Sequence, residues 1–160
     1  MAVNAYLFID GVQGPSTSQK GWIDIFSFSW GASNSSVIGS GSSGSESRAG
    51  RADLGNLTIM KVVDKTTPLL FEHCVTGDFV KKVELQYHKA TGTKQEVYYK
   101  ILMENVIVTG IQHSGSNENP SESVSFAYGK LKISYNPENE QGKFAGFIDK
   151  GYDGQKLVPW

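Results

Sequence analysis

Alternation of apolar and polar side chains is the feature that most limits what this chain can fold into. In VELQYH, residues 83–88, and in EVYYKILM, residues 96–103, every second residue is apolar. A period of two is typical of a β-strand that buries one face. Thr91 and Gly92 lie between the two stretches and suit a tight turn. We therefore predict a β-hairpin over residues 81–103.

The same pattern predicts strands along the rest of the chain, at residues 5–9, 22–30, 57–63, 105–112 and 123–135. In the last of these, the apolar residues change parity after Tyr128 and keep the new parity from Leu131 onward. One extra residue in a strand swaps its two faces, so we predict a β-bulge at Gly129.

One segment carries the signals of a helix. In TTPLLFEHCVTG, residues 66–77, Thr67 suits the N-cap, Pro68 the first helical position and Gly77 the C-terminal stop. The chain is therefore expected to be all-β with one short helix. Its 160 residues fit a single domain, 1–160, and we predict a closed or nearly closed antiparallel β-barrel or sandwich with a lateral helix.

Charge and cysteine content exclude several kinds of partner. The net charge is −1 and Lys and Arg are scattered, so the chain has no basic surface for nucleic acid or an anionic membrane. The one cysteine, Cys74, cannot form an intramolecular disulfide, which fits folding in a reducing cytosol. The N-terminus has no signal-peptide pattern and no stretch is long and apolar enough for a membrane span. We expect synthesis in the cytosol and no membrane insertion.

Motifs for catalysis, cofactors and metals are weak. GSGSSG at residues 39–44 matches G-x-G-x-x-G, but no apolar helix follows that would present its N-terminus to a phosphate. The three histidines, His73, His88 and His113, form no metal-binding pair. We interpret His88 as a solvated residue on the polar face of its strand, and Cys74 as a small buried thiol. We predict no catalytic residues, no cofactor and no metal site.

A Ser- and Gly-rich segment and a row of aromatic residues are expected to make contacts, but the sequence pattern does not identify their partners. Residues 33–51, SNSSVIGSGSSGSESRAGR, contain eight Ser and four Gly, which bury too little surface to order this stretch by itself. In the predicted strand 22–30, the aromatic residues from Trp22 to Trp30 share one face. We interpret this aromatic row as core, with packing of part of it against another subunit as the alternative.

Three stretches together resemble the Hcp family, the haemolysin-coregulated tube proteins of bacterial type VI secretion. They are AYLFIDGVQGPSTSQKGWIDIFSFSWG at residues 5–31, KVVDKTTPLLFEHCVTG at 61–77 and GKLKISYNP at 129–137. The resemblance implies a β-barrel with one lateral helix, and six copies that close into a ring around a pore. Rings of this family stack into a tube inside a contractile sheath and carry effectors in the lumen.

The resemblance also implies partners and a location. The chain would contact copies of itself and the sheath, spike and effector proteins. It would be made in the bacterial cytoplasm and leave for the extracellular space or a target cell without a signal peptide. Residues 138–160 depart most from the family pattern, and their role stays open.

Two groups of residues are expected to make contacts on this basis. Residues 33–51 correspond to the family's loop toward the neighbouring ring, with Val37 and Ile38 as an apolar anchor and charges at Glu46, Arg48 and Arg51. A surface loop without a partner is the alternative. In the polar connection 112–122, the candidates for facing the lumen or cargo are Ser114, Ser116, Asn117 and Asn119.

Two other functions remain as alternatives to a tube subunit. The first is a monomeric β-barrel that binds a small ligand or a glycan through its aromatic side chains. The second is a hydrolase with an unfamiliar site, which no motif in the sequence supports.

Overall fold

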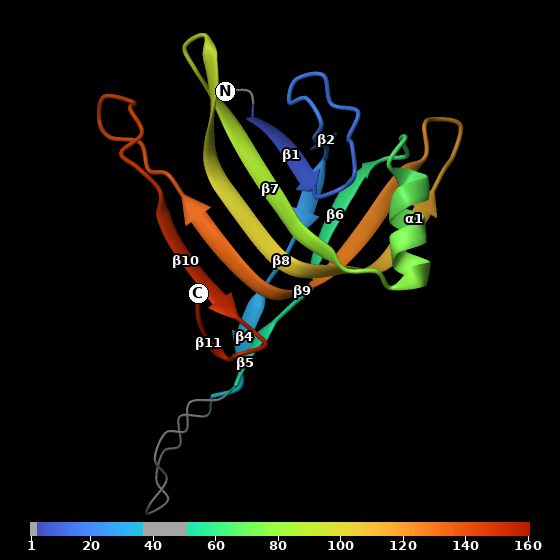
Figure 1. The fold of residues 1–160 in the computed structure, drawn as a ribbon. Coiled ribbons are helices and arrows are strands. Elements are labelled where there is room, and N and C mark those ends of the chain that lie inside the picture. Colours follow the sequence, from blue (N-terminus) through green and yellow to red (C-terminus); the bar gives the residue numbers. More distant parts are fainter. Residues whose placement is uncertain (1–2, 37–50) are drawn as a thin grey trace, which may run out of the picture.

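The computed structural model describes residues 3–36 and 51–160, which form strands and one helix (Figure 1). The N-terminal elements are β1 (Val3–Ile9), β2 (Ile23–Asp24), β3 (Ser27–Ser29) and β4 (Ala32–Asn34). They are followed by β5 (Ala52–Leu54), β6 (Leu57–Val62) and α1 (Thr67–Thr76). The C-terminal half contains β7 (Val80–Thr91), β8 (Lys94–Ser114), β9 (Ser121–Tyr135), β10 (Ile148–Asp153) and β11 (Val158–Pro159).

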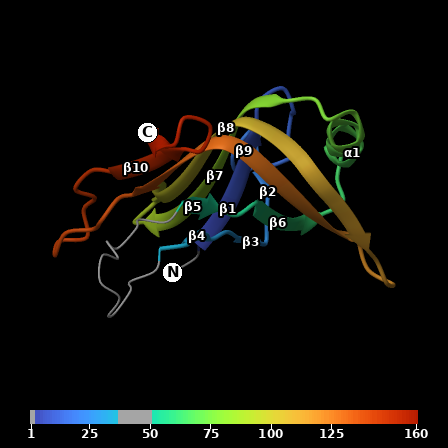
Figure 2. The ribbon, with the colours of Figure 1, turned by 90° about the horizontal axis from the view of Figure 1, so that it is seen from below.

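The main sheet is antiparallel and curls back on itself (Figures 1 and 2). Its strand order is β11-β10-β9-β8-β7-β1-β2, while β6 pairs with the first half of β9 and β3 pairs with β6. Between β2 and β3, the Ile25 N–H donates to Ala5 on β1 and the Phe26 N–H donates to Met60 on β6. Two consecutive backbone bonds therefore link the two ends of the sheet. The predicted antiparallel all-β fold with one helix is confirmed.

The hairpin predicted over residues 81–103 is present, with β7 and β8 as its strands and its turn at Gly92 and Thr93. The prediction of separate strands at 96–103 and 105–112 is wrong, because β8 is one strand of 21 residues. Asn105 lies within it with a positive φ of 54°. An Asn tolerates this backbone conformation, so the strand bends there without ending.

The β-bulge predicted at Gly129 is also wrong. Glu104 of β8 pairs with Lys130 and Val106 pairs with Tyr128, so neither strand has an extra residue at Gly129. The register of β7 with β8 is also constant on both sides of Asn105, since Lys82 pairs with Glu104 and Val80 pairs with Val106. Buried residues instead change parity together on three strands, from Val83 to Val80, from Met103 to Val106 and from Leu131 to Phe126. Because all three strands switch faces along one line, the sheet bends without a register shift.

The predicted strand 22–30 is divided between two partners, since β2 pairs with β1 and β3 pairs with β6. The chain crosses from one to the other at Ile25 and Phe26, which breaks the expected common face. Phe28 and Trp30 pack against the core as predicted. Phe26 lies at the crossing with 66% of its surface exposed, so the interpretation of the whole row as core is wrong.

Helix α1 lies beside the sheet and packs against β8 (Figures 1 and 2). Gly77 ends it in the left-handed conformation, and its N–H donates to the carbonyl of His73. The N-cap is Thr66, one residue before the predicted Thr67. Leu70 faces the apolar core, whose fully buried members also include Leu7, Ile23, Leu57, Ile59, Leu85, Ile101 and Phe126.

Candidate functional site

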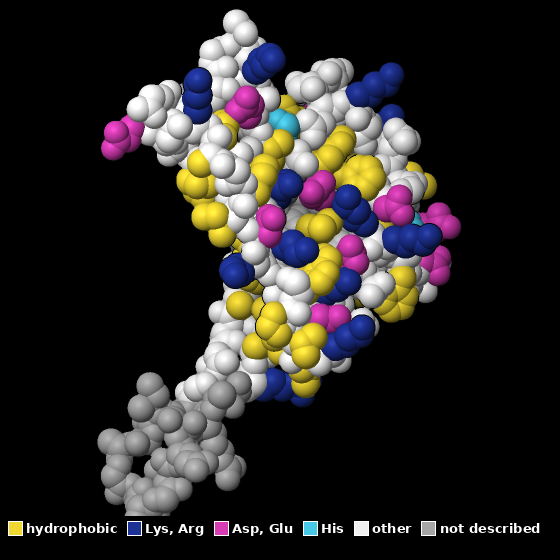
Figure 3. Space-filling model, turned by 60° about the vertical axis from the view of Figure 1, so that its left-hand side comes forward, with side chains coloured by type: hydrophobic (Ala, Val, Ile, Leu, Met, Phe, Trp, Pro, Cys, Tyr) yellow, Lys and Arg dark blue, Asp and Glu magenta, His cyan; other side chains and the backbone are white. Residues whose placement is uncertain are grey.

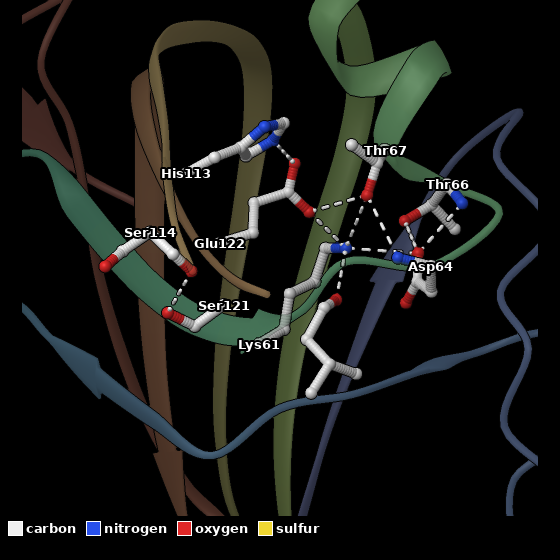
Figure 4. A network of polar contacts seen from close by, with 9 residues as sticks. Lys61, Asp64, Thr66, Thr67, His113, Ser114, Ser121 and Glu122 are labelled. Atoms are coloured by element: carbon white, nitrogen blue, oxygen red, sulfur yellow. Dashed lines mark hydrogen bonds and ion pairs between the residues drawn. The ribbon is translucent and has the colours of Figure 1, made fainter. Parts of the chain in front are cut away.

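A buried ion pair joins two strands below the start of α1 (Figure 4). Lys61 of β6 and Glu122 of β9 are directly opposite each other, form a salt bridge and have no exposed side-chain surface. The hydroxyl of Thr67, in the first turn of α1, donates to Glu122 Oε2 over 2.9 Å. Two charges at this depth are costly unless both are paired and hydrogen-bonded, which they are.

Asp64 extends this network to the loop before α1. Its Oδ1 lies 3.1 Å from Lys61 Nζ and accepts hydrogen bonds from the N–H and the hydroxyl of Thr66. The Asp64 N–H in turn donates to the hydroxyl of Thr67. The residues DKTTP therefore form a turn in which side-chain oxygens bind backbone N–H groups and fix the first turn of the helix.

His113 contacts the network from β8. Its Nε2 lies 3.1 Å from Glu122 Oε1, while about half of the His113 side chain is exposed. Glu122 is thus held by β6, β8 and α1 together. Because the ammonium and the carboxylate are both inaccessible, the network is suited to fixing the helix on the sheet.

The sequence analysis missed Lys61 and Glu122, although their positions carried a signal. Glu122 has the same parity as the buried Val124 and Phe126, and Lys61 has that of Leu57 and Ile59. Two opposite charges at inward positions of two strands indicate a buried pair.

The short ribbon of β4 and β5 borders a cleft of about 630 Å³. Its lining includes Arg51, Asp53, Tyr128 and Tyr152. The Tyr128 hydroxyl donates to the carbonyl of Gly55 and accepts a hydrogen bond from the Trp30 indole. Burial raises the pKa of Tyr128, and the Trp30 hydrogen bond opposes that shift, so the phenol is neutral at physiological pH.

Of the residues predicted for the inter-ring loop, only Arg51 lies within the described part of the chain. Its backbone N–H donates to the hydroxyl of Ser35, and its carbonyl accepts from the Ser35 N–H. The side chain of Arg51 is exposed at the cleft. Val37, Ile38, Glu46 and Arg48 lie outside the described residues.

The residues predicted to face the lumen lie on the connection between β8 and β9. Ser114, Ser116, Asn117 and Asn119 are all exposed. A second cleft of about 630 Å³ is lined by three of them, without Asn117, and by the exposed Phe26. The structure therefore brings the candidates together at one end of the molecule, and their contact with a lumen stays a prediction.

His88 is buried, with 6% of its surface exposed, so its interpretation as a solvated residue is wrong. The connection between β1 and β2 covers it, since Gln19 donates to Gln86, whose Oε1 also contacts His88 Nε2 at 3.0 Å. The ring of Tyr6 packs against it edge-on, 4.8 Å between centroids. Burial lowers the pKa of His88, because a protonated imidazole would lose its hydration. Cys74 is only partly buried, although it packs against the core as expected for a small thiol.

The C-terminal residues add two strands to the sheet. β10 pairs with the second half of β9, and β11 pairs with the end of β10. The indole of Trp160 lies within 4.3 Å of the Nζ atoms of Lys130 and Lys132. In the turn between β10 and β11, the N–H groups of Lys156 and Gln155 donate to Asp153 and hold the pKa of its carboxyl below the usual range.

Two searches of residues 3–36 and 51–160 bear on cofactors and membranes. No cluster of three or more His, Cys, Asp or Glu side chains is arranged to hold a metal ion in these ranges. Within the same ranges, no helix has the length and apolar character to cross a membrane.

Comparison with known proteins gives consistent results. The family described as "Type VI secretion system effector, Hcp" matches residues 6–135. Protein hcp1 of Pseudomonas aeruginosa is 29% identical over 111 residues, which cover 68% of each chain. The Major exported protein of the same species is 32% identical over 96 residues, which cover 54% of this chain and 55% of that protein.

Solved structures share the fold over the whole chain. A structure of a type six secretion system protein superposes with a TM-score of 0.88 at 28% identity, covering 99% of this chain and all of the other. Hcp1 from Salmonella typhimurium gives 0.76 at 27% identity, with both chains fully covered. Because the family match spans most of the sequence and the fold agrees from end to end, the chain belongs to the Hcp family of the type VI secretion system.

Proposed function

We propose that this chain is the subunit of a type VI secretion inner tube, in which six copies close into a ring and rings stack. The agreement in fold over the full chain with a type six secretion system protein carries this proposal. The proteins that it contacts would be its own copies and the sheath, spike and effectors of the apparatus. Effectors would travel in the lumen of the tube.

The arrangement of the chain ends and connections is compatible with stacking. The ribbon of β4 and β5 lies at one end of the molecule, and the connections β7–β8, β8–β9 and β9–β10 lie at the other (Figure 1). Residues 33–51 leave and return at the ribbon end, where Arg51 is exposed. We assign the contact with the next ring to this segment, and contact with cargo to Ser114, Ser116, Asn117 and Asn119.

The proposal includes a route out of the cell. One relative is named a major exported protein. The chain would therefore leave the bacterial cytoplasm through the secretion apparatus itself.

Solution mass is the first test. Light scattering of the purified protein should give six times 17.5 kDa, and negative-stain images of the same fraction should show open rings. A mass of 17.5 kDa at every concentration would contradict the proposal and favour a monomeric barrel that binds a ligand or glycan, with the cleft at Tyr128 and Tyr152 as its site.

A further inference from the structure

Exposed apolar side chains are concentrated in two places. Twelve large hydrophobic side chains are exposed in the described part of the chain, and nine of them fall into two groups. The first group, which we call the helix surface, is Leu69, Phe71, Val75 and Phe79. The second, which we call the edge surface, is Tyr135, Phe147, Ile148, Leu157 and Val158. Grouped exposure of this kind marks a surface that meets another molecule.

The helix surface combines one side of α1, Phe71 and Val75, with Leu69 at the start of the helix and Phe79 just after its end. Phe71 and Val75 are four residues apart and therefore lie on one side of the helix. They are 55% and 63% exposed, and Phe79, just after the helix, is 70% exposed. Leu70 and Cys74 lie on an adjacent side, about 100° around the helix axis from Phe71 and Val75, and pack against the core. The exposed residues therefore do not contribute to the core of the monomer.

The edge surface lies along an incompletely paired strand. β11 pairs only with Tyr152 and Asp153, so the outer edge of β10 from Ile148 to Lys150 has no neighbouring strand among the described residues. Ile148 is 60% exposed on this edge. A free edge with an apolar side chain is a site at which another chain readily packs or pairs.

The two surfaces are on opposite sides of the molecule. α1 lies at one side and β10 with β11 at the other, in both Figure 1 and Figure 2. Figure 3 is turned toward the β10 side and shows hydrophobic side chains among lysines there. A head-to-tail ring uses two different surfaces of each subunit, which must lie on its two flanks.

The apolar area is of the right size for such a contact. The four aromatic side chains have about 150–250 Å² of surface each and the five aliphatic ones less, so the nine, at about half exposure, present roughly 700–900 Å². A standard interface buries about 1,200–2,000 Å², of which the apolar part is about 700–1,300 Å². The two surfaces together match that range.

We propose that the helix surface of one copy packs against the edge surface of the next copy around the ring. This inference rests on the ring proposed above and names the two surfaces that close it. Each subunit would then use its helix surface on one neighbour and its edge surface on the other.

Mixing two defective variants tests the pairing directly. F71E/V75E places charges on the helix surface, and I148E places one on the edge surface. Each variant alone should have a mass of 17.5 kDa. Their equimolar mixture should contain dimers, because one intact helix surface and one intact edge surface remain to meet, and no rings should form. Gln95→Glu, on an exposed position of β8 outside both surfaces, should form rings like the wild type.

The outcomes separate this inference from the proposed tube. If both the wild type and F71E/V75E form normal rings, the inference is wrong. The tube proposal is then unaffected, and α1 is available to contact another partner. Wild-type rings, monomeric variants and a monomeric mixture would show that the two surfaces do not meet. A monomeric wild type would remove both proposals. Circular dichroism checks that each variant is folded, and F79E replaces F71E/V75E if the helix is lost.

Discussion

At the scale of single residues, the most unusual feature is a lysine and a glutamate that share the core. Neither side chain of the Lys61–Glu122 pair has any exposed surface. Removing two charges from water is expensive, and the cost is offset only because Thr67, Asp64 and His113 satisfy the remaining donors and acceptors. The pair therefore favours one specific placement of α1 more than it adds to net stability.

Removing one partner of the pair should be strongly destabilising. Glu122→Gln takes the fully buried carboxylate from Lys61 and leaves Asp64 as the remaining charged partner of the ammonium, and we expect the free energy of unfolding to fall by about 3 kcal/mol. Chemical denaturation of wild type and variant at one protein concentration measures it. Replacing both partners by apolar residues, as in K61M/E122L, should cost less than Glu122→Gln.

The matched control is the partly exposed pair Lys130–Glu104, whose side chains are 25% and 37% exposed. Glu104→Gln removes a carboxylate in the same way, and we expect a loss of about 0–1 kcal/mol. Equal losses for the two Glu→Gln variants would contradict a special role for the buried pair.

His88 should make stability depend on pH. Its pKa in the folded protein is lowered by burial, whereas in the unfolded chain it is about 6.5. Below pH 6.5 the unfolded state therefore binds more protons, so the free energy of unfolding falls until the pH drops below the folded-state pKa. His88→Gln, which cannot titrate, should have a flatter profile between pH 8 and pH 5. Parallel profiles for wild type and variant would refute this account.

At the scale of elements, both ends of α1 are set by local chemistry. Before its start, Asp64 accepts a hydrogen bond from the Thr66 N–H and Thr67 accepts one from the Asp64 N–H, and Gly77 takes the left-handed conformation at its end. Pro68 lies in the first turn, where no hydrogen bond is lost. Because these signals act within a few residues, the helix was predictable to within one residue at its N-cap.

Gly77→Ala tests the C-terminal end. The φ of Gly77 is 71°, a region that costs a residue with a Cβ about 1–2 kcal/mol. We expect a loss of that size in the free energy of unfolding, measured by thermal or chemical denaturation. Gly31→Ala is the control, since Gly31 has no positive φ and a Cβ there would meet no atom within 4 Å. A loss no larger than that of the control would show that the helix end relaxes.

At the scale of the whole molecule, ends and sides have different chemistry. The cleft at the ribbon end is lined by both polar and apolar side chains, among them Arg51, Asp53 and Leu157 of the neighbouring edge surface, and β4 and β5 flank residues 35–51 there. The two sides carry the helix surface and the edge surface, which are apolar. A subunit that meets ring neighbours through its sides and other rings through its ends would have this distribution.

Replacing residues 37–50 by Asn-Gly should separate the two kinds of contact. The two hydrogen bonds between Ser35 and Arg51 at the base of the segment lie outside the change. We expect ring mass by light scattering to be unchanged and tubes to be absent in electron micrographs. V37S/I38S/E46S/R48S keeps the length and removes the proposed contacts, so it should also stack poorly. Normal tubes from both variants would remove the role that we assign to this segment.

The sequence by itself determined the strand periodicity, the β7–β8 hairpin and the helix, because these depend on neighbours a few residues away. It did not determine where a strand changes partner, as at Ile25, or that β8 continues through Asn105. Nor did it determine that His88 is covered, since the covering residues come from the β1–β2 connection. Only the tertiary structure decided which charges are buried and which apolar residues remain exposed, because burial depends on segments that are distant in the chain.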